Sequence, residues 1–388
     1  MTNIPASPLG PRLGVIGGGQ LARMMTVPAI NLGLDVKVLA EIAGSSAQLA
    51  ATQVGDYRDL DTVRAFAETV DTITFDHEHV PQPILNALIE AGKSVQPGPT
   101  ALALAQNKIV MREQLQALGL PMPRWAAVHN ETELAEFLKT EGGRCIVKTP
   151  TGGYDGKGVR LISDATEAAD WFAASGNQPL LAEEAVDFVR ELAQLSARST
   201  TGEFRTWPLV ETVQLNGVCA EVLAPAPNTS ETQRQAAADI ASTVAEQIGN
   251  GAGVTGVLAV ELFERANGEL VINELAMRPH NSGHFTIEAS ATSQFEQHLR
   301  AVLGLPLGDT AMRAPAAVMI NILGGPAADS EKPTLASRLP DAAAVPEAKI
   351  HLYGKDPRPG RKVGHVTVLG ADIATARDAA KRAAATFD

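Results

Sequence analysis

The first forty residues restrict the fold most strongly, because they place a strand, a glycine turn, a helix and a second strand in direct succession. The strands are predicted at residues 13–16 and 35–40, the turn at residues 17–19 and the helix from residue 20 to about residue 32. Residues 70–75 read as a third strand. Strands that alternate with helices in this way form a parallel sheet with helical crossovers. The sequence therefore predicts a Rossmann-like α/β domain at this end of the chain.

The glycine turn places backbone N–H groups at the N-terminus of a helix, where a partial positive charge favours an anion. Three interpretations stay open here. Gly17, Gly19 and Ala22, with Glu41 as the acid after the second strand, fit a dinucleotide fingerprint. A single phosphate group fits equally well, and so does a tight turn with no ligand.

A second glycine-rich segment, residues 145–159, begins with a short apolar strand that carries Lys148. The glycines of the loop that follows are Gly152, Gly153, Gly156 and Gly158. Backbone amides without side chains can close around phosphate oxygens, and a lysine on the preceding strand can neutralise them. The spacing differs from that of a Walker loop, because no Gly-Lys-Ser/Thr follows a four-residue gap. We expect a nucleotide held under a flexible loop.

Composition excludes several classes of function. The net charge is −12 and aromatic residues make up 4% of the 388 residues, which argues against a nucleic-acid binder or an anionic-membrane binder. Two cysteines are too few for a disulfide framework or a zinc site. No run approaches about 18 consecutive apolar residues, and the first residues lack the pattern of a signal peptide. We expect a cytoplasmic protein.

Residues 257–278 predict a hairpin with two carboxylates. Asn267-Gly268 is a strong hairpin signal, since both residues tolerate positive φ. A two-residue turn at that point would place Glu261 directly opposite Glu274. Two like charges among apolar neighbours repel each other, and a divalent cation with hard oxygen ligands removes the conflict. The pattern favours a magnesium site, and a three-residue turn would weaken the argument.

The segment after this hairpin is a polar loop, which indicates either a binding site or an internally satisfied turn. It contains Arg278, His280, Asn281, Ser282 and His284. Zinc is disfavoured there, because no cysteine or third ligand lies nearby in the sequence.

Taken together, these segments resemble the N5-carboxyaminoimidazole ribonucleotide synthetases, an ATP-grasp family of purine biosynthesis. The matching segments, in the order of the family, are GVIGGGQLARMM, HEHVP, QNKIVMREQLQALGLP, IVKTPTGGYDGKGV, EEAVDFVRELAQLSARS, WPLVETVQLNGVCAEVLAPAP, INELAMRPHNSGHFTIEAS and YGKDPRPGRKVGHV. Each is a weak signal alone, but the ordered set is specific.

The resemblance implies a mixed α/β and α+β chain with an ATP-grasp fold, divided into three domains. These are a Rossmann-like domain at 12–106, an ATP-grasp domain at 107–312 with a lid lobe at about 120–188, and a small β-rich domain at 313–388. It further implies a homodimer that uses ATP and magnesium to join bicarbonate to the amine of 5-aminoimidazole ribonucleotide.

The resemblance also implies the roles of individual residues at the nucleotide. Lys108 and Lys148 would contact phosphates. Glu191 would accept a hydrogen bond from a ribose hydroxyl, and Glu261 and Glu274 would hold magnesium. The lid loop over the phosphates would comprise Gly153, Tyr154, Asp155, Gly156, Lys157, Gly158 and Val159. The adenine-binding linker would comprise Glu183, Glu184, Ala185 and Val186. Gln214 and Asn273 would complete the site.

For the ribonucleotide, the resemblance implies contacts from Gly18, Gly19, Gln20, Glu78, Asn281, Ser282, Lys355, Arg361 and Lys362. Tyr154, Asp155, Lys157 and Arg278 would take part in the reaction, with Asp155 handling a proton. The segment 355–362 carries four basic residues and one acid in a chain of net charge −12, which suits an anionic substrate.

The chain departs from the family pattern at several of these positions. Lys108 and Lys157 stand where arginine is common, so two-pronged anion contacts are in doubt there. Ala276 replaces the asparagine that many ATP-grasp enzymes place after the second carboxylate, and His77 is unusual. The alternatives are another ATP-grasp carboxylate–amine ligase, a nicotinamide-dependent oxidoreductase and an ATP-binding regulator without activity.

Overall fold

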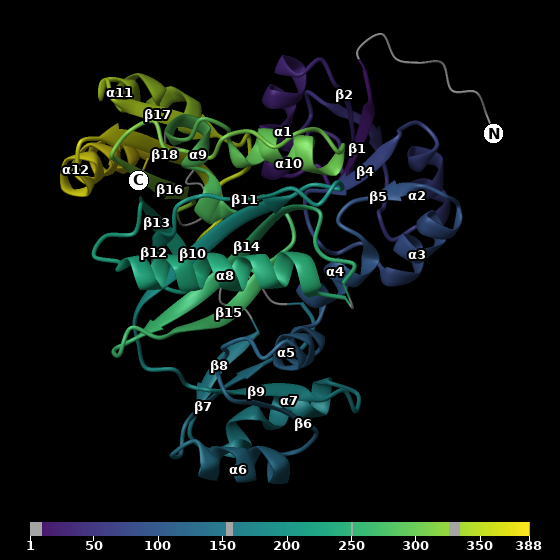
Figure 1. The fold of residues 1–388 in the computed structure, drawn as a ribbon, viewed down its shortest axis with the longest axis vertical. Coiled ribbons are helices and arrows are strands. Elements are labelled where there is room, and N and C mark those ends of the chain that lie inside the picture. Colours follow the sequence, from purple (N-terminus) through teal and green to yellow (C-terminus); the bar gives the residue numbers. More distant parts are fainter. Residues whose placement is uncertain (1–9, 153–157, 250, 326–333, 388) are drawn as a thin grey trace.

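The structure is a computed structural model that describes residues 10–152, 158–249, 251–325 and 334–387. Within these ranges the strands form three sheets, which Figure 1 shows as three regions of the molecule. None of the helices found there combines the length and the apolar character that crossing a bilayer requires.

The N-terminal sheet is parallel and confirms the predicted α/β domain. Its strand order is β3-β2-β1-β4-β5. The strands are β1 (Arg12–Ile16), β2 (Asp35–Ala40), β3 (Ala51–Val54), β4 (Thr72–Phe75) and β5 (Ser94–Val95). The helices are α1 (Gln20–Asn31), α2 (Leu60–Ala67), α3 (Gln82–Glu90) and α4 (Pro99–Gln106). Residues on α1 such as Met24 and Met25 pack against Phe295 and Leu299 of α10, which ties this domain to the rest of the chain.

A small antiparallel sheet forms the lobe that lies at the bottom of Figure 1. Its order is β6-β9-β7-β8. The elements are β6 (Trp125–Val128), α6 (Glu131–Thr140), β7 (Cys145–Lys148), β8 (Val159–Ile162), η1 (Ala165–Ala168), α7 (Ala169–Ala174) and β9 (Leu180–Glu184). This lobe has its own apolar core, which includes Leu134, Val147 and Leu180. Helix α5 (Lys108–Ala117) lies between the lobe and the central sheet, and Asn107 caps its first turn.

The central sheet is antiparallel and continues without a break into the C-terminal strands, in the order β15-β14-β10-β12-β13-β16-β18-β17, with β11 paired to β10. The strands are β10 (Phe188–Arg198), β11 (Phe204–Thr206), β12 (Val210–Leu215), β13 (Val218–Ala224), β14 (Gly256–Arg265), β15 (Leu270–Ala276), β16 (Ala316–Leu323), β17 (Ala348–Leu352) and β18 (Lys362–Gly370). The predicted division at residue 313 thus falls between strands of one sheet, and the three domain boundaries stay a prediction.

Two long helices, α8 (Glu231–Gln247) and α12 (Ile373–Ala384), pack on different parts of the central sheet. Helix α8 packs its buried residues, such as Ile240 and Val244, against Leu258 and Val260. The remaining elements are η2 (Asn281–Gly283), α9 (Thr286–Ala289), α10 (Gln294–Val302), η3 (Leu335–Arg338), α11 (Leu339–Ala343) and η4 (Ala385–Phe387). The alanines of α12 pack onto β16 and β18 around Val318 and Val366.

Candidate functional site

The two predicted carboxylates are directly opposed, with Glu261 on β14 paired to Glu274 on β15. The prediction of a two-residue turn is wrong, although the predicted pairing of the two acids is present. Arg265 N–H donates to Glu269 O at 2.9 Å and Gly268 N–H donates to Arg265 O at 2.9 Å, so the loop has three residues. That loop alone would shift the register by one. A β-bulge in which Asn273 is the extra residue restores the pairing of the two acids.

Each of these carboxylates already contacts a basic side chain from another element. Lys108 Nζ, at the start of α5, lies 3.1 Å from Glu274 Oε1, and His280 Nε2 lies 3.1 Å from Glu261 Oε1. Burial by itself would raise the pKa of Glu261, but the hydrogen bond from His280 and the charges of His280, Lys362 and Arg278 hold that pKa below its ordinary value. The site therefore presents an ionised carboxylate at Glu261.

Lys148 belongs to a buried ionic network behind the two acids. Its Nζ lies 2.7 Å from Glu183 Oε2 and 3.3 Å from Asn273 Oδ1. Glu183 also accepts from Arg112, which donates to the carbonyl oxygens of Ile272 and Asn273 at 3.0 and 2.7 Å. Burial opposes the ionisation of Glu183, but the charges of Lys148 and Arg112 prevail and lower its pKa to about 2.

Arg112 was missed in the sequence, although a signal for it exists. It lies four residues after Lys108 and so shares a face of helix α5 with a predicted phosphate contact. Its position fixes the bulge at Asn273 to the lobe strand that carries Glu183.

The predicted adenine linker runs from the end of β9 into the segment before β10. Glu183 uses its side chain in the buried network, and Glu184 accepts from Arg265 at 2.8 Å. Ala185 and Val186 are half-buried. These four residues connect the lobe to the central sheet, and their contact with adenine stays a prediction.

Glu191 on β10 lies close enough to Glu261 for the two carboxyl groups to interact electrostatically. Gln214 Nε2 donates to Glu191 Oε2 at 3.3 Å. Burial and the negative charge of Glu261 raise the pKa of Glu191 to about 7, against the smaller opposing effect of Gln214. Near neutral pH this carboxyl group is divided between its two protonation states.

Only the end of the predicted lid loop can be placed. Gly158 O accepts from Thr149 N–H at 3.0 Å, and Val159 pairs with Lys148 as β8 begins. Gly153, Tyr154, Asp155, Gly156 and Lys157 lie outside the described residues.

The first glycine loop is packed against acids that the sequence analysis did not place there. A Cβ added to Gly19 would lie 2.0 Å from Asp76 Oδ2, and Ala22 N–H donates to Asp76 Oδ1 at 2.7 Å. Gly18 N–H donates to Glu41 at 3.1 Å, and His77 contacts the same carboxylate at 3.0 Å. Two N–H groups that were expected to bind phosphate, those of Gly18 and Ala22, therefore already donate to carboxylates. Glu41 itself contacts both the loop and His77.

Asp76 and Glu41 differ in their electrostatics. Burial raises the pKa of Asp76, opposed by the Ala22 N–H and by nearby cations that include Lys355 and Arg278. The hydrogen bond from His77 lowers the pKa of Glu41 to about 2. The sequence analysis assigned no role to Asp76, although its position directly after the predicted strand at residues 70–75 was an available signal.

Several predicted substrate residues converge on this loop from distant parts of the chain. Lys355 donates to Gln20, more than 300 positions away. Arg278 Nε donates to Glu78 Oε2 at 2.6 Å, and Met277 N–H donates to the other oxygen at 3.1 Å. These contacts join the N-terminal domain to the segment directly after β15 and to the C-terminal segment that carries Lys355.

The other predicted substrate residues behave differently. Asn281 and Asn321 exchange side-chain hydrogen bonds at 2.7 and 2.8 Å, and both are buried. The Ser282 hydroxyl lies 2.9 Å from His280 Nδ1 and is also buried. These two side chains hold the loop that presents His280. Arg361 donates to the carbonyl oxygen of Asp356 at 3.1 Å in an exposed turn, while Lys362 begins β18 and acts on Glu261 electrostatically.

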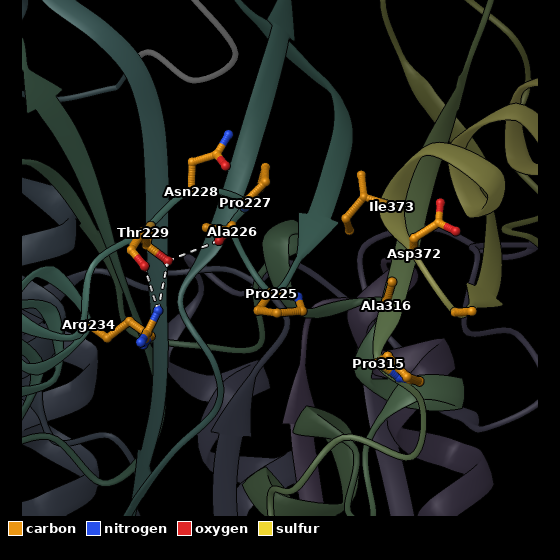
Figure 2. Close-up of a pocket in the computed structure, with 11 residues that line it drawn as sticks. Pro225, Ala226, Pro227, Asn228, Thr229, Arg234, Pro315, Ala316, Asp372 and Ile373 are labelled. Carbon is orange, nitrogen blue, oxygen red and sulfur yellow. Dashed lines mark hydrogen bonds between the residues drawn. The ribbon is translucent and has the colours of Figure 1, made fainter.

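A hollow of about 420 Å³ lies elsewhere on the molecule, between the end of β13, the start of α8 and the start of α12. Figure 2 shows the residues that line it. The predicted site residues do not line it. Its charged residues are Arg234, which donates to Thr229 O at 2.6 Å, and Asp372, which caps α12. The hollow therefore lacks the converging acids and lysines found between the lobe and the central sheet.

Three family profiles match the chain in order. They are the ribonucleotide synthetase preATP-grasp domain at residues 11–106, the ATP-grasp domain at 113–295 and the phosphoribosylaminoimidazole carboxylase C-terminal domain at 317–379. Among relatives, the N5-carboxyaminoimidazole ribonucleotide synthase of Corynebacterium ammoniagenes is 47% identical, covering 99% of this chain and 93% of the relative. That of Mycobacterium tuberculosis strain H37Rv is 45% identical, covering 97% and 87%.

Solved structures agree with these matches. An ADP complex of N5-carboxyaminoimidazole ribonucleotide synthetase has a TM-score of 0.87 and 34% identity, covering 99% of this chain and 98% of that one. The Aspergillus clavatus synthase with ADP and 5-aminoimidazole ribonucleotide has a TM-score of 0.87 and 32% identity, covering 97% and 98%.

Proposed function

Because the chain belongs to the N5-carboxyaminoimidazole ribonucleotide synthase family of ATP-grasp proteins, we propose that it is an ATP-dependent carbon–nitrogen ligase of purine biosynthesis. It joins bicarbonate to the exocyclic amine of 5-aminoimidazole ribonucleotide and converts ATP to ADP and phosphate. The observation that carries the proposal is the opposed pair Glu261 and Glu274, set beside Lys108 and the Lys148 network.

ATP lies between the lobe and the central sheet in this proposal. Lys108 and Lys148 neutralise phosphate oxygens, and the loop from Gly153 to Val159 closes over them. The backbone of residues 183–186 forms hydrogen bonds with the adenine. Glu191 accepts a hydrogen bond from a ribose hydroxyl, and Gln214 lies beside Glu191. Lys108 and Lys148 now contact Glu274 and Glu183, so arriving phosphates compete with carboxylates already in place.

Glu261 and Glu274 also suit magnesium, since they are opposed carboxylates with hard oxygen donors. Asn273 adds an amide beside them. When bound, magnesium supplies positive charge that balances the triphosphate. Without it the two acids rely on His280 and Lys108 as partners.

In this reaction the protein positions the reactants and stabilises the negative charge that develops. Bicarbonate attacks the γ-phosphate, ADP leaves, and the carboxyphosphate formed transfers its carboxyl group to the amine. Lys108 and Lys148 stabilise the negative charge that develops, and the closed loop excludes water. Asp155 is assigned the proton of the amine, and Tyr154, Lys157 and Arg278 are assigned to the same reaction.

Arg278 is held by Glu78 at the junction of the domains, close to where Lys355 meets Gln20. Lys355, Arg361 and Lys362 supply the positive charge for the ribonucleotide phosphate, and the Gly18-Gly19 turn lines its pocket. Asn281 and Ser282 support this pocket by fixing the loop of His280.

A coupled assay of ADP release tests the proposal, with ATP, bicarbonate and aminoimidazole ribonucleotide omitted one at a time. We expect full turnover only with all three. ADP release that does not depend on aminoimidazole ribonucleotide points to another ATP-grasp ligase. Binding of NADH in preference to ATP overturns the proposal in favour of an oxidoreductase.

The assembly and location inferred from the family complete the proposal. We take the protein to be a cytoplasmic homodimer, and sedimentation equilibrium of the purified chain tests the dimer.

A further inference from the structure

A cluster of two histidines and one glutamate lies outside the proposed reaction site. Glu288 comes from α9, His351 from β17 and His365 from β18, where the two histidines are register partners on neighbouring strands. One donor atom of each residue lies within 4.8 Å of the donor atoms of the other two. Helix α9 therefore meets the C-terminal hairpin through three groups that can each donate an electron pair to a metal ion.

Two donor atoms of this cluster are buried without a partner. Among the residues that the structure describes, neither Glu288 Oε2 nor His365 Nε2 has a hydrogen-bond partner, and His365 is fully buried. Buried polar atoms are nearly always paired, so two such atoms facing one cluster require an explanation. A bound cation satisfies both atoms at once.

Hydrogen bonds and ring stacking hold the two histidines. Tyr353 Oη lies 2.7 Å from His365 Nδ1, so Nε2 is the ring nitrogen of His365 that remains available to a metal ion. Metal-binding histidines commonly contact a fixed polar group through their second ring nitrogen in this way. His351 Nε2 lies 2.7 Å from Glu288 Oε1, and its ring stacks on that of His365 with centroids 4.4 Å apart, so the His351 ring must rotate when both histidines bind one ion.

A fourth polar residue, His284, lies beside the cluster. Gln294 Nε2 donates to both His280 O and His284 Nδ1, so neutral His284 carries its hydrogen on Nε2. That Nε2 is buried and, within the described ranges, has no acceptor, and the ring centroids of His284 and His365 are 5.1 Å apart. The neighbourhood of the cluster therefore contains three buried polar atoms for which the described residues supply no partner.

We propose that Glu288, His351 and His365 form a binding site for a divalent transition-metal ion of the zinc class, distinct from the magnesium site at Glu261 and Glu274. Two imidazole nitrogens and one carboxylate are a ligand set that zinc accepts, whereas magnesium prefers oxygen ligands. Zinc holds its ligand atoms about 3.4 Å apart, so the side chains close in by at most about 1.4 Å in any pair. The ion ties α9 to the C-terminal hairpin.

Metal content of the full chain tests the site without any nucleotide, so the result does not depend on the proposed reaction. The protein is stripped with chelator and dialysed against zinc, and bound zinc is measured. We expect about one equivalent that magnesium does not displace. Cobalt in place of zinc should give visible absorption of the kind produced by imidazole ligands in a site of low symmetry.

The test variant is His351→Ala, because this side chain is 28% exposed and its loss leaves the core intact. Zinc affinity should fall at least about 10-fold and the cobalt absorption should disappear. The matched control is His129→Ala, since His129 also lies beside a glutamate, Glu133, but in an exposed i,i+4 pair. Its zinc binding should equal that of the unaltered chain.

Glu261→Gln separates the two metal sites and should leave zinc binding at the cluster unchanged. Equal zinc binding by His351→Ala and the unaltered chain overturns the proposal, as does the absence of zinc binding by the unaltered chain. In either case the cluster is a hydrogen-bonded contact and nothing more.

Discussion

At Glu191, one carboxyl group titrates in the range where the protein works. Its pKa of about 7, raised by burial and by Glu261 from an ordinary value of 4.5, means that the folded state binds more protons than the unfolded state between these values. Stability therefore falls as the pH rises through this window. Glutamine resembles the protonated carboxyl group. The free energy of unfolding of Glu191→Gln should therefore equal that of the unaltered protein near pH 5 and exceed it by about 1–2 kcal/mol at about pH 8, a figure reduced to allow for the partial exposure of the side chain.

Urea unfolding at both pH values measures this difference in the ligand-free protein. The control is Glu90→Gln, which removes an exposed carboxylate at the end of α3 and should have the same effect at both pH values. An equal effect of Glu191→Gln at about pH 5 and about pH 8 would contradict the raised pKa.

Substitutions of Lys108 test its proposed role as a phosphate contact, because they can remove its charge or keep it. Removing its charge in Lys108→Met should lower ADP production about 100-fold or more, as expected when a group that stabilises developing charge is lost. Lys108→Arg should retain most activity, because arginine keeps the charge and its longer side chain can still reach Glu274. Steady-state kinetics with Lys139→Met as control, at an exposed lysine of α6, check this. Activity of Lys108→Met within about threefold of the control would refute the assigned role.

At the scale of elements, the network of Arg112, Glu183 and Lys148 joins α5, β9 and β7 to the bulge in β15. Arg112 is fully buried, so Arg112→Met leaves Glu183 with one cation and two strand carbonyls without donors. The expected cost is about 3–5 kcal/mol of unfolding free energy. Combining it with Glu183→Gln should recover part of this loss, which a double-mutant cycle in urea measures.

The same network predicts a pH dependence in acid. The pKa of Glu183 falls from an ordinary 4.5 to about 2, so its contribution to stability is complete above about pH 4.5 and is lost as the pH falls toward 2. Glu183→Gln should flatten the stability profile in that window. An unchanged slope between about pH 4.5 and about pH 2 would show that Glu183 is not ionised there.

The hairpin shows which part of the site the sequence could predict. Asn267 and Gly268 correctly located the reversal, since Gly268 has φ +84° and Asn267 Oδ1 accepts from Glu269 N–H at 3.0 Å. The three-residue length and the compensating bulge could not be predicted, because the bulge is stabilised by Arg112 and Lys148 from elements far away in sequence. The position of the turn could therefore be predicted from its own residues, whereas the bulge that restores the pairing depends on residues from other elements.

At the scale of the molecule, the sequence pattern predicted the parallel N-terminal sheet but not the continuity of the central sheet. The three predicted strands alternate with helices, so their parallel arrangement follows from local rules, whereas the strand order comes from the structure alone. The pairing of β13 with β16 joins residues between 93 and 99 positions apart, and no periodicity encodes it. The contact between Asp76 and the first glycine loop could not be predicted either, because Asp76 lies 54 positions beyond Ala22.

This continuity predicts the outcome of cutting the chain at the inferred boundary. A fragment of residues 1–312 loses β16, leaves the edge of β13 unpaired and exposes the core around Leu223. Long unpaired edges with apolar faces associate with one another, so the fragment should aggregate and bind a hydrophobic dye. Co-expression with residues 313–388 should restore a monodisperse species on size-exclusion chromatography, since the missing strand can then pair. A fragment that stays monodisperse alone and unfolds cooperatively within about 5 °C of the full chain would show that the C-terminal strands are a separate unit, despite the shared sheet.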